Sequence, residues 1–171
     1  WKGASDGPFA LPGAYGLPNH PMVMVTHHEA AAFCNWLSRK RGEQIALPTQ
    51  RQWEMAATAN GQRAFPWGDA SPAPDLANWV DSGVAGATAV GIFPRGATAA
   101  GVADLAGYVW EWCDSGEDQR PADSAAPAAG ESVRLVLGGS YMDSADAMRH
   151  GYWLKSVASY SALDCGFRVV K

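Results

Sequence analysis

Two carboxylates stand close together in the stretch DLAGYVWEW, where Glu111 follows Asp104 by seven positions and lies between Trp110 and Trp112. Burial among aromatic rings disfavours a charged carboxylate unless a cation or several hydrogen-bond donors compensate it. Calcium prefers carboxylate and main-chain carbonyl oxygens, and it can hold an irregular loop in one conformation. The alternative without an ion is that Asp104 forms a turn and Glu111 accepts hydrogen bonds from main-chain amides.

The cysteines and histidines do not suggest another reactive set. Cys34, Cys113 and Cys165 have no Cys-x-x-Cys spacing and therefore do not predict a zinc or dithiol site. They are either buried apolar thiols in a reducing compartment, or two of them form a disulfide in an oxidising one. His27 and His28 point in different directions from one helix start, which predicts surface or capping roles.

The composition limits the class of protein. With 171 residues, 47% hydrophobic and 18% charged, residues 1–171 are predicted to form a single globular domain. A net charge of −4 without a long run of lysine and arginine argues against binding to nucleic acid or an anionic membrane surface. The sequence has no apolar stretch of about 18 residues, so it predicts no membrane span. The 8 Trp, 19 Gly and 11 Pro indicate many turns and an aromatic core.

A first helix with a complete capping signal is predicted within residues 25–42. Thr26 is the expected N-cap, and Glu29 stands where it completes a capping box. Apolar residues then recur at helical spacing, which places Phe33 in the core. Gly42 is the expected end of the helix.

A second helix within residues 47–61 repeats the same signals. Thr49 is the expected N-cap, and Gln52 occupies the position that completes the capping box. Trp53 begins the apolar stripe and is predicted to lie in the core, while Gly61 is the expected end.

The remaining chain shows little sustained periodicity. Residues 1–22 are predicted to form a loop, residues 62–104 short strands within long ordered loops, and residues 115–132 an exposed polar loop. A stretch as long as 62–104 normally requires a bound ion or a function to stay ordered. Residues 133–141 predict a strand that ends in a glycine turn, and residues 165–171 a closing strand.

Seven fragments, in this order, resemble the formylglycine-generating enzyme family, also called the sulfatase-modifying factor family. They are HPMVMVTHHEAAAFCNWL, LPTQRQWEMAA, FPWGD, ANW, GVADLAGYVWEW, LGGSYM and CGFRVV. The resemblance extends from about Trp1 to Lys171 and implies an α+β domain, a variant of the C-type lectin fold with two short helices, short strands and much irregular loop. The family's usual first portion has no counterpart, so we expect the N-terminal part of the domain to be missing.

The resemblance also implies calcium as a cofactor, at two sites. The first would use two carboxylates and two carbonyl oxygens of one loop, from Asp104, Gly107, Val109 and Glu111. The second would use the side chain of Asn78, the carbonyl of Trp79 and the carboxylate of Asp81. The loop that follows the second site is shorter than in the enzymes, so its other ligands have no counterpart.

This chain lacks the sulfur donors that the redox chemistry of the family requires. Formylglycine-generating enzymes oxidise a substrate cysteine with molecular oxygen, through two cysteines after the GGS turn that hold copper(I). The matching positions are Asp143 and Met148. A carboxylate and a thioether cannot reproduce a linear dithiolate copper site, because carboxylates prefer harder ions. Ala46, Tyr108 and Leu137 also replace polar residues of the family pattern, so formylglycine-generating activity is predicted to be absent.

Residues 140–164 carry aromatic and cationic side chains of the kind that lines recognition surfaces. The family forms its substrate groove here, so the resemblance implies a ligand-binding set of Ser140, Tyr141, Arg149, Tyr152 and Trp153. The expected partner is a protein, a peptide or a peptidic small molecule. The alternative is that the aromatic residues pack against the core of the domain.

Three functions remain open for this chain. The first is a non-catalytic, calcium-stabilised binding or regulatory module on the family scaffold. The second is a divergent periplasmic oxidoreductase, similar to family members that serve siderophore chromophore maturation, for which Arg149 and the aromatic residues argue. The third is a variable ligand-display protein with a lectin-like fold. Calcium and possible disulfide chemistry favour an exported protein, periplasmic or extracellular.

Overall fold

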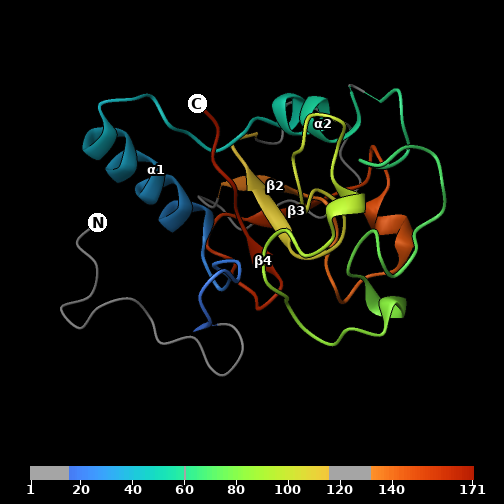
Figure 1. Ribbon diagram of the computed structural model, residues 1–171. Coiled ribbons are helices and arrows are strands. Elements are labelled where there is room, and N and C mark those ends of the chain that lie inside the picture. Colours follow the sequence, from blue (N-terminus) through green and yellow to red (C-terminus); the bar gives the residue numbers. More distant parts are fainter. Residues whose placement is uncertain (1–15, 60, 116–131) are drawn as a thin grey trace.

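The computed structural model describes residues 16–59, 61–115 and 132–171. Two α-helices pack against a small mixed sheet, and this confirms the α+β class (Figure 1). The helices are α1 (His27–Arg41) and α2 (Gln50–Thr58), and the strands are β1 (Trp110–Cys113), β2 (Val133–Leu137), β3 (Trp153–Val157) and β4 (Cys165–Gly166). In the sheet, whose order is β3-β2-β1-β4, β1 runs antiparallel to β2 and parallel to β4.

The capping signals of α1 are confirmed. The Thr26 hydroxyl accepts a hydrogen bond from the Glu29 amide, and the Glu29 carboxylate accepts one from the Thr26 amide. Gly42 follows the helix in the left-handed conformation, with φ of 66°. Phe33 is only half-buried and packs against the Phe167 ring, so its prediction as a core residue is only partly correct.

The start of α2 is confirmed, but its predicted end at Gly61 is wrong. The capping box of Thr49 and Gln52 is present, whereas the helix ends at Thr58 and Ala59 takes the left-handed conformation. The Thr58 hydroxyl accepts a hydrogen bond from the Gly61 amide and lies 2.9 Å from Nδ1 of His150. The helix prediction did not include His150. These tertiary contacts turn the chain before Gly61.

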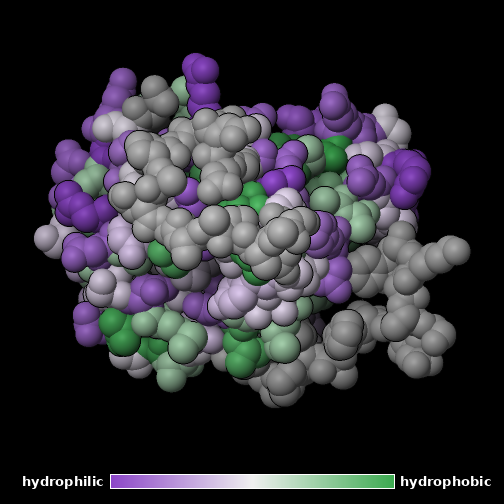
Figure 2. Space-filling model, turned by 180° about the vertical axis from the view of Figure 1, so that it is seen from behind, coloured by the Kyte–Doolittle hydropathy of each residue, from purple (hydrophilic) through white to green (hydrophobic). Residues whose placement is uncertain are grey.

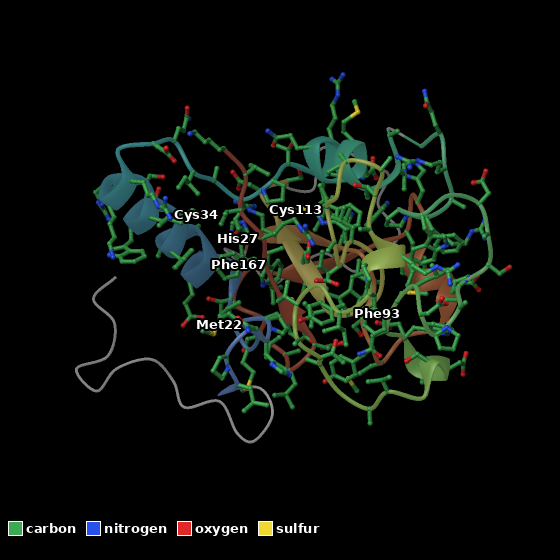
Figure 3. The ribbon with its side chains drawn as sticks, viewed as in Figure 1. Met22, His27, Cys34, Phe93, Cys113 and Phe167 are labelled. Carbon is green, nitrogen blue, oxygen red and sulfur yellow. The ribbon has the colours of Figure 1, made fainter. Side chains whose placement is uncertain are left out.

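The sheet separates two hydrophobic clusters. Trp110 and Trp112 of β1 point to one side, where they pack with residues of α1 that include Cys34. Cys113 points to the other side and packs with residues of α2 that include Trp53 (Figure 3). This alternation follows from the pleat of the strand, and it places Glu111 on the side of α2.

All three cysteines lie in the described part of the chain, and each is buried and unpaired. Burial raises the pKa of the Cys113 thiol well above its usual range. Cys34 lies on the side of the sheet that α1 covers, and Cys113 lies on the side that α2 covers. The sheet therefore separates these two thiols (Figure 3). The structure therefore has buried apolar thiols without a disulfide, while the compartment of the protein stays a prediction.

The long segment 62–104 differs from the prediction, because it contains no strand of the sheet in its described residues. Its regular pieces are the 3-10 helices η2 (Val80–Ser82) and η3 (Pro94–Gly96), together with isolated bridges. The amide of Tyr108 donates to the carbonyl of Asn78 at 2.8 Å, so this segment pairs with the loop before β1 instead.

Two strands, β1 and β3, were not predicted, and the closing strand is shorter than expected. Only Cys165–Gly166 joins the sheet, while Val170 forms a separate bridge with Ala46. The loops predicted at residues 1–22 and 115–132 fall largely outside the described residues, which omit 1–15 and 116–131. No helix in the described part is long and apolar enough to cross a membrane.

Candidate functional site

Glu111 is 5% exposed, and its carboxylate is bound by two side chains from distant parts of the sequence. Its Oε2 accepts hydrogen bonds from Nε1 of Trp53 at 2.6 Å and from Nε of Arg168 at 2.5 Å. Its Oε1 accepts from Nη2 of Arg168 at 2.6 Å. A two-pronged pair of this kind is among the strongest hydrogen-bonded contacts in proteins. Side chains, rather than the main-chain amides of the alternative without an ion, therefore compensate the buried charge.

Arg168 was not recognised as a site residue from the sequence. Burial lowers its pKa, but the Glu111 charge and its hydrogen bonds outweigh this effect and raise the pKa overall. The strand pairing explains its position, because Glu111 lies opposite Gly166 in the parallel pair of β1 and β4. A signal was available in the sequence, since a carboxylate predicted between two core tryptophans requires a cationic partner.

The loop before β1 is tightly curled. Asp104, Gly107 and Tyr108 all have positive φ, at 58°, 66° and 80°. A positive φ is unusual for a bulky residue such as Tyr108 and occurs where surrounding structure enforces it. A side chain at Gly107 would meet the carbonyl oxygen of Asn78 at 2.3 Å. The loop is therefore fixed by close contact with the segment that contains Asn78.

The first predicted calcium site is brought together only in part. Asp104 accepts a hydrogen bond from the Gly91 amide at 2.7 Å, and burial is the main cause that raises the pKa of its carboxyl group. Val109 is buried within a hydrophobic cluster. Asp104 and Glu111 both lie near Arg168, which hydrogen-bonds the Asp104 carbonyl oxygen at 3.1 Å. Calcium at this loop stays a prediction.

The predicted ligands of the second calcium site already make hydrogen bonds within the protein. Asn78 is fully buried, and its Oδ1 accepts from Oγ of Ser82 at 3.0 Å while its Nδ2 donates to the Gly86 carbonyl oxygen. The Trp79 carbonyl oxygen accepts from the Ser82 amide, and Asp81 is exposed. Throughout residues 16–59, 61–115 and 132–171, no three His, Cys, Asp or Glu side chains form a group that could hold a metal ion.

Asp143 and Met148, which the resemblance matches to two copper-binding cysteines, have structural roles. Met148 is 3% exposed and packs in a cluster that includes Phe65 and Trp79. Asp143 accepts hydrogen bonds from the amide and the hydroxyl of Ser140, at 3.0 and 2.5 Å. One residue therefore fills the core and the other fixes a turn.

Of the predicted ligand-binding residues, Ser140 and Tyr152 lie beside the same part of β1. The Ser140 hydroxyl is 2.9 Å from Oδ2 of Asp164, whose carbonyl oxygen accepts from the Trp110 amide. The Tyr152 ring is tilted against the ring of Trp110, with centroids 6.1 Å apart. Tyr141 joins the loop before β1, because its amide donates to the carbonyl of Tyr108.

The other two predicted ligand-binding residues face different surroundings. Arg149 is exposed and its guanidinium lies 5.4 Å from the centre of the Phe65 ring. Trp153 is half-buried in β3 and packs against the cluster around Trp53. For Trp153 the core-packing alternative therefore holds, and the structure does not gather all five side chains in one place.

His27 does not have the surface position that was predicted for it. It is 5% exposed, lies edge-on to the Trp112 ring, and faces the sheet from the first turn of α1 (Figure 3). Its Nε2 is 3.6 Å from Oδ1 of Asp114 and has no hydrogen-bond partner among the described residues. Burial is the main cause that lowers the pKa of His27.

Several proteins of known name are similar in sequence. The hercynine oxygenase of Mycolicibacterium thermoresistibile is 34% identical in an alignment that covers 79% of this chain and 32% of that protein. The inactive C-alpha-formylglycine-generating enzyme 2 of Mus musculus is 33% identical over 74% of this chain and 39% of its own length. The formylglycine-generating enzyme of Thermomonospora curvata is 30% identical over 78% of this chain and 52% of its own. The chain thus spans about a third to a half of these relatives.

Solved structures support the fold, and a family profile supports the ancestry. PvdO from Pseudomonas aeruginosa has a TM-score of 0.75 at 25% identity, over 90% of this chain and 62% of its own. Treponema denticola variable protein 1 has a TM-score of 0.74 at 22% identity, over 97% and 75%. The profile described as the sulfatase-modifying factor enzyme 1-like domain matches residues 6–171. The chain therefore belongs to the formylglycine-generating, or sulfatase-modifying factor, enzyme family.

Proposed function

We propose that this protein is a non-catalytic binding or regulatory module built on the scaffold of the formylglycine-generating enzymes. The observation that carries the proposal is the pair of positions where the resemblance places two copper-binding cysteines. Met148 is buried in the core there, and Asp143 holds the Ser140 turn. Neither residue supplies a thiolate, and the three thiols of the chain are buried elsewhere. The family also includes relatives named as inactive.

The proposed binding surface lies within residues 140–164 and contacts a protein or a peptide. Apolar residues are scattered over the face of the molecule that Figure 2 shows. In this segment the most exposed are Met142, Tyr152 and Tyr160, at 62%, 44% and 47%. Methionine and tyrosine are enriched in protein interfaces, and tyrosine buries a large area at low conformational cost.

The first experiment tests the absence of catalysis. The protein would be incubated with copper, oxygen and a cysteine peptide that formylglycine-generating enzymes accept, and the peptide would be analysed by mass spectrometry. We expect unmodified cysteine, while the enzyme of Thermomonospora curvata converts the same peptide in parallel. Enzymatic aldehyde formation by this chain would refute the proposal.

The second experiment tests the binding surface. Peptides selected from a random display library for binding to the wild type would be tested against a triple variant, Met142→Ser, Tyr152→Ser and Tyr160→Ser. We expect binding to be lost without a change in fold, since the three side chains are exposed. The control is Met55→Ser, at a methionine of α2 that is 49% exposed, and it should leave binding intact. Peptides that bind the triple variant equally well would place the binding surface elsewhere.

A divergent oxidoreductase is the second candidate. It is favoured by the similarity to proteins named hercynine oxygenase and by the exposed Arg149, whose guanidinium lies 5.4 Å from the centre of the Phe65 ring. Oxygen uptake in the presence of candidate peptidic substrates separates the two functions. Turnover that vanishes in Arg149→Ala would favour the enzyme, whereas no uptake with any substrate would favour the module. Export from the cytoplasm stays a prediction.

A further inference from the structure

The terminal nitrogen Nη2 of Arg168 lies among three oxygen atoms of the strand and loop that were predicted to hold calcium. These are Oε1 of Glu111 at 2.6 Å, the carbonyl oxygen of Asp104 at 3.1 Å and the carbonyl oxygen of Ala103 at 3.2 Å. The neighbouring Nε donates to the other oxygen of Glu111. A carboxylate and two carbonyls around one point are the surroundings of a bound cation.

We propose that the guanidinium of Arg168 is the resident cation of this loop and takes the place at Glu111 that the family resemblance assigns to calcium. Glu111 contributes one negative charge and Arg168 one positive charge, so the pair is already neutral. The planar group matches the carboxylate with two parallel hydrogen bonds, which a spherical ion cannot do. The proposal is independent of the proposed binding function.

The residues present do not fit a calcium ion at this position. Calcium requires six to eight oxygen ligands. Both oxygens of Glu111 accept from Arg168, and one of them accepts from Trp53 as well. One oxygen of the Asp104 carboxylate accepts a hydrogen bond from the Gly91 amide. An ion beside Glu111 would therefore have to displace a cation or face its repulsion.

The position of Arg168 is fixed by the sheet. Gly166, two residues earlier, pairs with Glu111 in β4 and β1. A Cβ at Gly166 would lie 2.5 Å from the carbonyl oxygen of Met22, so the chain is also held from its other side. Arg168 therefore follows β4 by two residues, and the pairing of β4 with β1 places its side chain beside Glu111.

The direct test uses the wild-type protein and calcium alone. Its melting temperature would be measured in excess calcium and in excess chelator, and calcium binding would be followed by calorimetry. We expect the same melting temperature in both and no heat of binding. A ligand that binds only the folded state raises the melting temperature. A clear rise with calcium, together with stoichiometric binding, would overturn the proposal.

Variants of Arg168 provide the second arm. Arg168→Gln leaves Glu111 without its cation, and we expect the melting temperature to fall by roughly 10 °C and to become dependent on calcium. The control Arg95→Gln removes an arginine of an exposed pair with Asp75 and should change little. Should Arg168→Gln not fold, Arg168→Lys keeps the charge and should fold with a lower melting temperature that calcium does not change. Calcium binding by the wild type as tight as by Arg168→Gln would contradict the proposal.

Discussion

Glu111 carries a buried charge, and the stability of the core depends on the compensation of this charge. Its side chain extends from β1 beside a hydrophobic cluster, and three hydrogen bonds from Trp53 and Arg168 satisfy the carboxylate. Removing one partner of a buried pair costs about 3–5 kcal/mol, because the other charge is left uncompensated. An exposed pair such as Arg95 and Asp75 contributes about 0–1 kcal/mol.

The indole of Trp53 offers a test of this compensation. Trp53→Phe keeps an aromatic ring in the cluster but removes the donor to Glu111, so we expect a loss of about 1.5–3 kcal/mol in the free energy of unfolding. Trp67→Phe is the matched control, because that indole donates to the Ala70 carbonyl at an exposed position. Urea denaturation measures both. Equal losses in the two variants would contradict the role given to Trp53.

His27 predicts a loss of stability in mild acid. Burial lowers its pKa from the ordinary value, Arg134 and His28 lower it further, and Asp114 opposes them. The unfolded chain therefore takes up a proton near pH 6.5 that the folded protein resists, and stability falls as the pH drops below about 6.5. His27→Gln should flatten this part of the stability curve. His28→Gln, at an exposed position, should keep most of the slope, because His28 is the weakest of the influences on His27. A curve equally steep in both variants would refute the assignment.

The strand β1 organises the elements around it. It lies between β2 and β4, with α1 packed on one face and α2 associated with the other. The loop that leads into it is pressed against the segment containing Asn78, where the carbonyl oxygen of Asn78 accepts from the Tyr108 amide. Gly107 makes this approach possible because it has no side chain.

Two glycines with the same φ allow the cost of backbone strain to be measured separately from the cost of steric crowding. Gly42 and Gly107 both have φ of 66°, but a Cβ at Gly42 meets nothing within 4 Å while one at Gly107 meets Asn78 and the sulfur of Met148. Gly42→Ala should cost about 1–2 kcal/mol, the usual penalty of the left-handed conformation. Gly107→Ala should cost clearly more. Thermal unfolding of the two variants measures the difference, and similar losses would show that the loop can relax.

The helices could be predicted from the sequence because their signals are local. The capping boxes of Thr26 and Thr49 involve residues three positions apart, and both form as expected. The strands β1 and β3 and the pair of Glu111 and Arg168 could not be found this way. Their partners lie far along the chain, and Glu111 and Arg168 are 57 positions apart. The end of α2 was misplaced for the same reason, since Thr58 is held by the distant His150.

At the scale of the whole molecule, the chain keeps the family scaffold, while Asp143 and Met148 stand where the resemblance places the copper-binding cysteines. The fold matches solved structures over 90% or more of its length in two cases. The family assignment was predictable because seven fragments survive in order. The roles of Asp143 and Met148 in a turn and in the core could only come from the structure, because they depend on neighbours such as Ser140 and Phe65.

The most direct measurement of the central claim is an anaerobic titration of the protein with cuprous copper against a chromogenic copper(I) chelator. Formylglycine-generating enzyme from Thermomonospora curvata serves as the positive control. Because no thiolate stands at position 143 or 148, we predict that the chelator retains all of the copper. If the protein instead bound one copper ion per chain and formed an aldehyde on a cysteine peptide, this result would contradict the account.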